Sequence, residues 1–366
     1  MANTVFGVND AETNKVWAKK LNVEALKKAW VGKFIGSSDN SLIQEHKDLK
    51  KSRGDRITYT LRTQIQGRGA VGDAILKGNE EKLTHYSDNL IIDQLRHAVD
   101  RGGNMTQQRV LMDLRKGCMD ALSDWTAARL DRSFFLQAAG YTATDLVTEH
   151  GESYEGDDIA YTGLQATLAP SSGRHFWSES GATADENLDN SGDNMALSLI
   201  DDLVTEAKLS SPLIRPVKVD GEDRYVMFLH PLQVKSLRKD AATAGNWVDI
   251  QKAAMQGGKV SDNPIFTGAL GVYNGVILHE STRVPRGVNS STGVSISTVR
   301  RAIFCGAQSV SLGFGNGSDF ESWNWAEEEE DYGNQLGVAA GCIFGMKKAR
   351  FNSVDFGCMV LSTYAA

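Results

Sequence analysis

The chain has 366 residues, of which 41% are hydrophobic and 23% charged, an ordinary globular balance that excludes wholesale disorder. Its 46 acidic residues outnumber 39 basic ones, giving a formal charge of -7. A protein that grips nucleic acid over its whole surface carries the opposite sign. The longest nearly apolar run, 336–346, falls short of the ~20 residues of a membrane span, and the first residues lack a signal-peptide core. We therefore expect a soluble protein made in the cytoplasm, with one large domain or two.

At the N-terminal end, residues 10–35 alternate apolar side chains with lysines, which predicts an amphipathic helix. Such a helix can lie on a membrane, but no second membrane feature accompanies it. The favoured interpretation is an arm whose apolar face docks on another protein surface. The residues expected to make that inter-subunit contact are Trp17, Leu21, Leu26 and Trp30.

After a charged linker at 45–56, residues 57–65 alternate apolar and polar side chains, as a half-buried strand does. A glycine-rich polar stretch and a second apolar segment follow. Residues 57–95 are therefore predicted to form two extended limbs joined by a mobile tip. The glycines expected to give that tip its conformational freedom are Gly67, Gly69, Gly72 and Gly78.

Residues 67–72 also match the G-x-G-x-x-G pattern of dinucleotide-binding proteins. The pattern needs a following apolar helix whose N-terminus faces the pyrophosphate, and a second strand that completes a βαβ unit. Here only a short apolar stretch follows before Gly78. A nucleotide-dependent enzyme is therefore the least favoured alternative, which a binding assay with NAD or ATP would test.

From 106 to about 139 the apolar residues recur at spacings of three and four, which predicts one long helix. Charged residues that include Arg129 and Asp131 interleave with them and are expected on its wetter face. Gly140 is the expected C-terminal stop. The side chains predicted to pack this helix on the core are Leu111, Leu114, Cys118, Leu122 and Trp125.

Residues 141–193 are rich in small polar and acidic residues and are expected to be an irregular insertion, followed by an amphipathic helix over 195–209. The remaining chain is rich in strand patterns, interrupted by helical segments at 231–239 and 247–255. Strands are predicted at 224–229, 275–278, 294–297, 301–305, 309–314, 336–344 and 353–361. The fold class expected is α+β with antiparallel strands.

Local patterns of catalytic or metal-binding residues are absent. The seven histidines lie at least twelve residues apart, although a triad assembled from distant residues stays open. The acidic run 327–331 lacks calcium-loop spacing and is expected to be a solvated or inter-subunit loop. The cysteines have apolar neighbours typical of buried structural thiols; they are Cys118, Cys305, Cys342 and Cys358.

The order of these features resembles the major capsid proteins of tailed bacteriophages, which share the Hong Kong 97-like fold. It is most similar to the podovirus-type branch with large genomes. The segments that carry the resemblance are 54–69, 121–135, 224–240, 268–281 with Val284 and Pro285, 300–315 and 347–363. Each is degenerate alone, and their order and spacing make the resemblance specific.

The resemblance implies an N-terminal arm, an extended loop, a peripheral domain with a long spine helix, and an axial domain. The expected division is 1–53 for the arm, 54–103 for the loop, 104–217 with 346–366 for the peripheral domain, and 218–345 for the axial domain. The insertion at 141–193 lies within the peripheral part.

The resemblance also implies a function in the virion, that of a non-enzymatic shell protein. Copies would form hexamers and pentamers of an icosahedral shell around double-stranded DNA, without a cofactor. The implied partners are other copies, a portal protein, and scaffolding or decoration proteins. An encapsulin-like nanocompartment shell, which shares the fold but encloses an enzyme, is the alternative.

Overall fold

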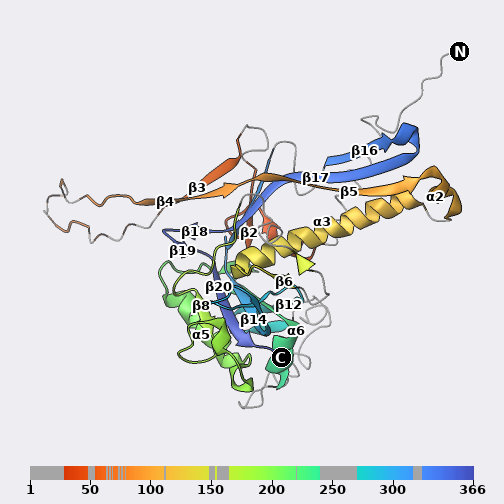
Figure 1. The fold of residues 1–366 in the computed structure, drawn as a ribbon. Coiled ribbons are helices and arrows are strands. Elements are labelled where there is room, and N and C mark those ends of the chain that lie inside the picture. Colours follow the sequence, from red (N-terminus) through yellow and green to blue (C-terminus); the bar gives the residue numbers. More distant parts are fainter. Residues whose placement is uncertain are drawn as a thin grey trace.

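The computed structural model contains two large β-sheets, a long helix and a protruding hairpin (Figure 1). No helix among the described residues is long and apolar enough to cross a bilayer. The residues it describes are 29–47, 54–62, 65, 67, 69–72, 75, 77–78, 80–110, 113–147, 153–154, 165–219, 221–239, 270–315 and 324–366.

The eight-stranded sheet has the order β11-β12-β10-β14-β20-β8, with β13 and β9 paired at its sides. Its central strands are nearly continuous apolar runs because both faces are covered. One face packs against α5 (Leu197–Leu209) and α6 (Pro231–Lys239). The other packs against the C-terminal half of the long helix. The strands are β8 (His175–Trp177), β9 (Val217–Val219), β10 (Glu222–Leu229), β11 (Gly271–Tyr273), β12 (Val276–Glu280), β13 (Arg286–Val288), β14 (Ser295–Cys305) and β20 (Cys358–Tyr364).

The six-stranded sheet has the order β1-β2-β15-β17-β16, and β5 pairs with β17. Strand β17 is 14 residues long, and β5 and β16 run antiparallel to it over most of that length. Figure 1 shows this long part extending away from the eight-stranded sheet. The strands are β1 (Ile35–Gly36), β2 (Ile43–His46), β5 (Asp93–Gly103), β15 (Val310–Phe314), β16 (Asn324–Glu330) and β17 (Gln335–Lys348).

The long helix α3 (Leu114–Ala139) lies beneath this second sheet. Gly140 adopts the left-handed conformation, and the N–H groups of Gly140 and Tyr141 donate to the carbonyls of Gln137 and Leu136. This Schellman arrangement confirms Gly140 as the stop. The helix does not reach back to residue 106, because Asp113 caps α3 by accepting from two backbone N–H groups, and α2 (Asn104–Arg109) is separate.

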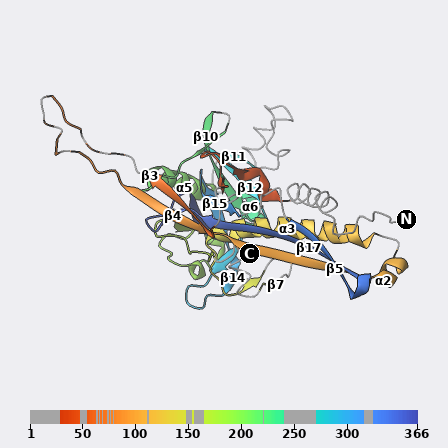
Figure 2. The ribbon, with the colours of Figure 1, turned by 90° about the horizontal axis from the view of Figure 1, so that it is seen from above.

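Strands β3 (Arg56–Arg62) and β4 (His85–Ile91) form an antiparallel hairpin, which confirms the two extended limbs. Figures 1 and 2 show the hairpin projecting from one side of the molecule, while α2 and the end of β5 project from the opposite side. The molecule is therefore elongated, with a protrusion at each end.

The expected end of the N-terminal helix is wrong. Residues 30–34 form a 3-10 turn, η1 (Trp30–Phe34), and β1 follows, so the predicted helix over 10–35 does not reach its expected end. Within the part expected to form the arm, residues 43–46 form β2, which pairs with β15. Within the expected insertion at 141–193, β8 pairs with β20 of the eight-stranded sheet.

Each of the two large sheets combines segments from several parts of the chain. Strand β20, assigned with 346–366 to the part containing the spine helix, lies in the eight-stranded sheet. Strands β15, β16 and β17, assigned to the axial part, lie in the sheet above α3. The strands predicted at 294–297 and 301–305 form one strand, β14. The helix predicted at 231–239 is confirmed, and the one at 247–255 lies outside the described residues.

Two short strand pairs and three 3-10 turns complete the described chain. They are the strand pair β6 (Leu146–Val147) with β7 (Ser153–Tyr154), the pair β18 (Arg350–Phe351) with β19 (Val354–Asp355), and the 3-10 turns η3 (Asp185–Asn187), η4 (Ser191–Asp193) and η6 (Asp331–Gly333).

Candidate functional site: surfaces for assembly

The base of the β3–β4 hairpin is packed tightly against the six-stranded sheet. Ile57, Leu90 and Ile92 form a buried cluster there. A Cβ placed on Gly313 would lie 2.7 Å from Ile57 and 2.8 Å from Leu90. Only glycine lets the hairpin come this close, so its base is fixed in position.

Asp88 of β4 ties the same base to the body by charge. Its carboxylate accepts from Lys347 Nζ at 2.5 Å, from the Tyr59 hydroxyl at 2.9 Å and from the Arg350 backbone N–H at 3.0 Å. Lys347 also donates to the Asn89 carbonyl. Burial, followed by the Asp88 charge, raises the pKa of Tyr59, which keeps this phenol neutral and able to donate.

The tip of the hairpin, unlike its buried base, exposes apolar side chains to solvent. Ile65, Val71 and Ile75 are 61%, 76% and 75% exposed, and Leu83 is also exposed. Gly69, Gly72 and Gly78 have positive φ and open space around the Cβ position, whereas Gly67 donates its N–H to Glu81. Apolar side chains exposed on a two-stranded protrusion favour contact with another protein.

The residues predicted to pack the spine helix on the core differ in how deeply they are buried. Leu122 is fully buried and Cys118 nearly so, whereas Leu114 and Trp125 are half-buried and Leu111 lies outside the described residues. Trp125 stacks on His97 of β5 with ring centroids 4.5 Å apart. These contacts join α3 to the sheet.

The prediction that Arg129 and Asp131 lie on the solvent-exposed face of α3 is wrong. Arg129 is 6% exposed and Asp131 fully buried. Asp131 accepts from the backbone N–H groups of Trp30 and Val31 and forms an ion pair with Arg283. Trp30, proposed for the inter-subunit arm, packs on Phe135 and Phe228 of its own chain. The other three arm residues, Trp17, Leu21 and Leu26, lie outside the described part.

Strands β5, β17 and β16 form a long three-stranded surface, here called the platform, that faces α3 on one side. On its outer side, Ala98, Ala339 and Ala326 lie side by side across the three strands. Arg96 lies flat across Gly341, where a Cβ would come within 2.7 Å of the arginine side chain. The middle of the outer face, at Ala98, Ala339 and Ala326, therefore carries only small side chains.

The acidic run 327–331 is not a loop along its length, because Glu327 to Glu330 belong to β16. Glu327 is buried and accepts from Arg115 and from the Trp325 ring N–H. The described residues contain no group of three His, Cys, Asp or Glu side chains that could hold a metal ion. The ion pair with Arg115, on the side of the platform that faces α3, explains why an acidic residue stands at position 327.

Ser362, His175 and Asp185 come together from distant segments, as a catalytic triad would. Ser362 Oγ and Asp185 Oδ1 contact the same ring nitrogen of His175, at 2.8 and 3.3 Å, and Ser362 is fully buried. A relay needs the acid and the nucleophile on different ring nitrogens. Arg301 also binds Asp185, so the group anchors the segment around β8 to β14.

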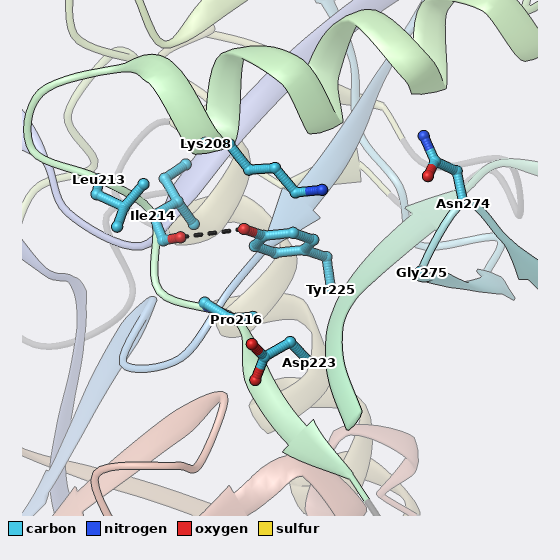
Figure 3. A pocket seen from close by; sticks show the side chains of 8 residues that line it. All are labelled: Lys208, Leu213, Ile214, Pro216, Asp223, Tyr225, Asn274 and Gly275. Carbon is cyan, nitrogen blue, oxygen red and sulfur yellow. Dashed lines mark hydrogen bonds between the residues drawn. The ribbon is translucent and has the colours of Figure 1, made fainter. Parts of the chain in front are cut away.

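An open pocket of about 390 Å³ lies between the end of α5 and β10 (Figure 3). Tyr225 donates its hydroxyl to the Ile214 carbonyl at 3.3 Å, and Lys208 and Asp223 lie on opposite sides of its ring. Leu213 and Pro216 complete the apolar wall. The lining has no paired nucleophile and base, so it has no arrangement for covalent catalysis.

The four cysteines are buried free thiols. Burial raises the pKa of Cys358 to about 12 and that of Cys305 well above its usual value. Both thiols are therefore protonated and unreactive at neutral pH, as expected of structural cysteines.

Comparisons with known proteins agree with this fold. Residues 5–366 match the family model described as phage capsid protein. A major capsid protein of Pseudomonas phage KPP25 is 30% identical over 375 residues, covering 97% of this chain and 95% of that protein. The capsid of Ralstonia phage GP4 is 32% identical with a TM-score of 0.77, covering 100% of this chain and 99% of that one.

The capsid structure of cyanophage Pam1, at 22% identity, covers the whole of both chains with a TM-score of 0.71 and so shares the fold. These matches confirm the expected mixed α and β capsid fold and the suspected family, and they give no support to the encapsulin or nucleotide-enzyme alternatives. The chain belongs to the phage capsid protein family.

Proposed function

We propose that this chain is the major capsid protein of a tailed phage. Copies assemble in the host cytoplasm into hexamers and pentamers of an icosahedral shell that encloses double-stranded DNA. The role is structural, not enzymatic, and the partners beyond other copies are a portal and scaffolding or decoration proteins. Family membership and similarity to the KPP25 and GP4 capsid proteins support this.

The observation that carries the proposal is the contrast within the hairpin, whose clamped base holds an exposed apolar tip away from the body. We propose that this tip lies across the outer face of the platform on the neighbouring copy. The hairpin and the far end of the platform project from opposite sides of the molecule (Figure 1). Contacts between unlike surfaces of identical subunits can close rings, as capsomers require.

Electron microscopy of the purified protein, beside size-exclusion chromatography, tests the assembly. Closed particles or rings are expected, and nucleic acid inside them distinguishes a phage shell from a compartment filled with cargo protein. A monomer that binds NAD or ATP with micromolar affinity would contradict the proposal.

The contact itself is tested by Ala339→Trp on the outer face and Val71→Asp at the tip. Both side chains are accessible, so both variants should fold with unchanged far-ultraviolet circular dichroism but fail to form particles. Thr205→Trp, on the exposed side of α5, is the matched control and should assemble. Normal particles from both test variants would refute the contact.

A further inference from the structure

The turn that joins β16 to β17 presents one tyrosine entirely to solvent. Tyr332, in η6, has a relative exposure of 108%, the highest of the exposed large apolar side chains in the described chain. The turn lies beside α2 at the far end of the platform (Figure 1). The ring therefore has no packing contact within its own copy.

Hydrogen bonds from α2 hold this turn in place. Asn104 donates its backbone N–H to the Asn334 carbonyl at 3.1 Å and its side-chain amide to the Gly333 carbonyl at 3.2 Å. Asp331 accepts from the Asn334 side chain. Tyr332 itself adopts φ 55° and ψ 37°, a left-handed conformation that a bulky residue rarely takes. A fixed backbone thus holds out an aromatic ring, the kind of side chain that anchors protein interfaces.

Negative charge lies directly before the tyrosine. Glu328, Glu329 and Glu330, at the end of β16, are all exposed. Glu330 forms no ion pair with another described residue. The turn therefore carries an apolar ring that ends in a hydroxyl, with an unpaired carboxylate two residues away.

The pocket at the end of α5 has complementary features. Leu213 and Pro216 form its apolar wall, and Leu213 is 52% exposed. Lys208 and Asp223, neither of them paired with another described residue, are exposed on opposite sides of the Tyr225 ring (Figure 3). Burial, followed by the Asp223 charge, raises the pKa of Tyr225, which agrees with a carboxylate close to the pocket. The pocket therefore offers an apolar wall, a hydrogen-bond acceptor and a cation.

The tyrosine fits this pocket better than any other exposed apolar side chain of the described residues. Only Tyr332 among them has a hydroxyl that can donate to Asp223. A pocket of about 390 Å³ has room for one aromatic side chain. Glu330 has the charge to pair with Lys208. Figures 1 and 2 place α2 at one end of the molecule and α5 well away from it, so the turn cannot enter the pocket of its own copy.

We propose that Tyr332 of one copy inserts into the pocket between α5 and β10 of a neighbouring copy. The ring packs on Leu213, the hydroxyl donates to Asp223, and Glu330 pairs with Lys208. This inference rests on the proposed self-assembly and adds to it a contact between unlike surfaces that does not involve the hairpin.

Cysteine cross-linking between two single variants tests the contact. Copies carrying Tyr332→Cys are mixed with copies carrying Leu213→Cys, allowed to assemble and treated with a short bismaleimide; the native thiols are buried and unreactive. A dimer joined through positions 332 and 213 is expected and is identified by mass spectrometry of its tryptic peptides. In the control, Met105→Cys, an exposed apolar position on α2, replaces Tyr332→Cys and should give no such dimer.

The outcomes separate this contact from the shell function. Particles that form without the 332–213 cross-link, or with 332–332 cross-links only, would overturn the contact and leave the shell function standing. A protein that stays monomeric would overturn both.

The protein concentration needed for assembly gives a second readout. Tyr332→Ala should raise it about tenfold, as loss of an aromatic anchor does, and Tyr332→Phe, which keeps the ring but loses the donor, about threefold. Met105→Ala is the matched control and should leave it unchanged. Lys208→Glu should also raise it, and addition of Glu330→Lys in the same chain should restore it. Assembly of Tyr332→Ala at the wild-type concentration would refute the contact.

Discussion

The two halves of α3 each carry an aspartate on the same face of the helix, Asp124 and Asp131, in opposite environments. Asp131, in the C-terminal half, is fully buried and accepts two backbone hydrogen bonds and an ion pair from Arg283. Asp124, seven residues earlier, is exposed to solvent. The C-terminal half is covered on nearly every side, and the N-terminal half on only one. A carboxylate on this helix becomes an anchor wherever a distant segment covers it.

Replacement of Asp131 should have the largest effect on stability. Asp131→Ala leaves the N–H groups of Trp30 and Val31 without an acceptor and Arg283 without its partner, so we expect a loss of about 3–5 kcal/mol in the free energy of unfolding. Chemical denaturation measures this loss. Asp124→Ala is the control and should stay within about 0.5 kcal/mol, as exposed substitutions do. Equal effects at the two positions would break the comparison.

This contrast also shows what the sequence could predict. Periodicity found the hairpin limbs, α5, α6 and the Gly140 stop, because these depend on nearby residues. Periodicity placed Asp131 on the solvent-exposed face of α3. The groups that cover it belong to Trp30 and Arg283, which lie 101 and 152 residues away from Asp131 in the sequence.

The other aspartates that hold distant segments together could not be predicted either, because their partners also lie far away in the sequence. Asp88 binds Lys347 across 259 residues, and Asp185 binds Arg301 across 116. Asp355, fully buried, accepts from Lys348 and from the backbone N–H of Ser171 across 184 residues. Each anchor ties an irregular segment or the hairpin to a sheet, and no local pattern marks an aspartate for that role.

Trp125 tests how deeply the N-terminal half of α3 is packed. Full burial would make Trp125→Ala cost about 3–5 kcal/mol, but the side chain is half-buried against His97, so we expect about 2 kcal/mol. Phe134→Ala, fully buried in the other half, should show the full cost in the same denaturation experiment. A Trp125 loss as large as that of Phe134 would mean that the N-terminal half is covered as well as the C-terminal half.

Buried aspartates should differ in their response to acid. Burial raises the pKa of Asp131 above 3.8, and its hydrogen bonds and Arg283 offset this only in part. Burial also opposes ionisation of Asp185, but its hydrogen bond to His175 and the Arg301 charge hold its pKa well below 3.8.

The direction in which each aspartate changes the stability with pH follows from the linkage between proton binding and folding. Asp185 contributes stability that is present above pH 3.8 and lost as the pH falls further, whereas the contribution of Asp131 is present below 3.8 and lost as the pH rises through its folded value. Between about pH 5 and 2, Asp185→Asn should therefore flatten the acid loss of stability, by at most about 1.4 kcal/mol per pH unit. Asp131→Asn should steepen it. Urea unfolding across this pH range measures both slopes, and slopes that match the wild type would contradict the assignment.

The smallest expected effect concerns the point where α3 begins. A single helix from 106 to 139 would place Asp113 in its interior, where alanine is the better helix former. As the cap of α3, Asp113 accepts from the Arg115 and Lys116 N–H groups, so Asp113→Ala should cost about 1 kcal/mol. Asp113→Asn keeps an acceptor while removing the charge and should cost little, which separates the effect of the capping hydrogen bonds from that of the charge. Hydrogen exchange at residues 114–117 reports the same event locally, because loss of the cap frays the first turn. If exchange at these residues is faster in the alanine variant but unchanged in the asparagine variant, the first turn of α3 is held by the hydrogen bonds that Asp113 accepts. The charge of Asp113 is then not what holds it.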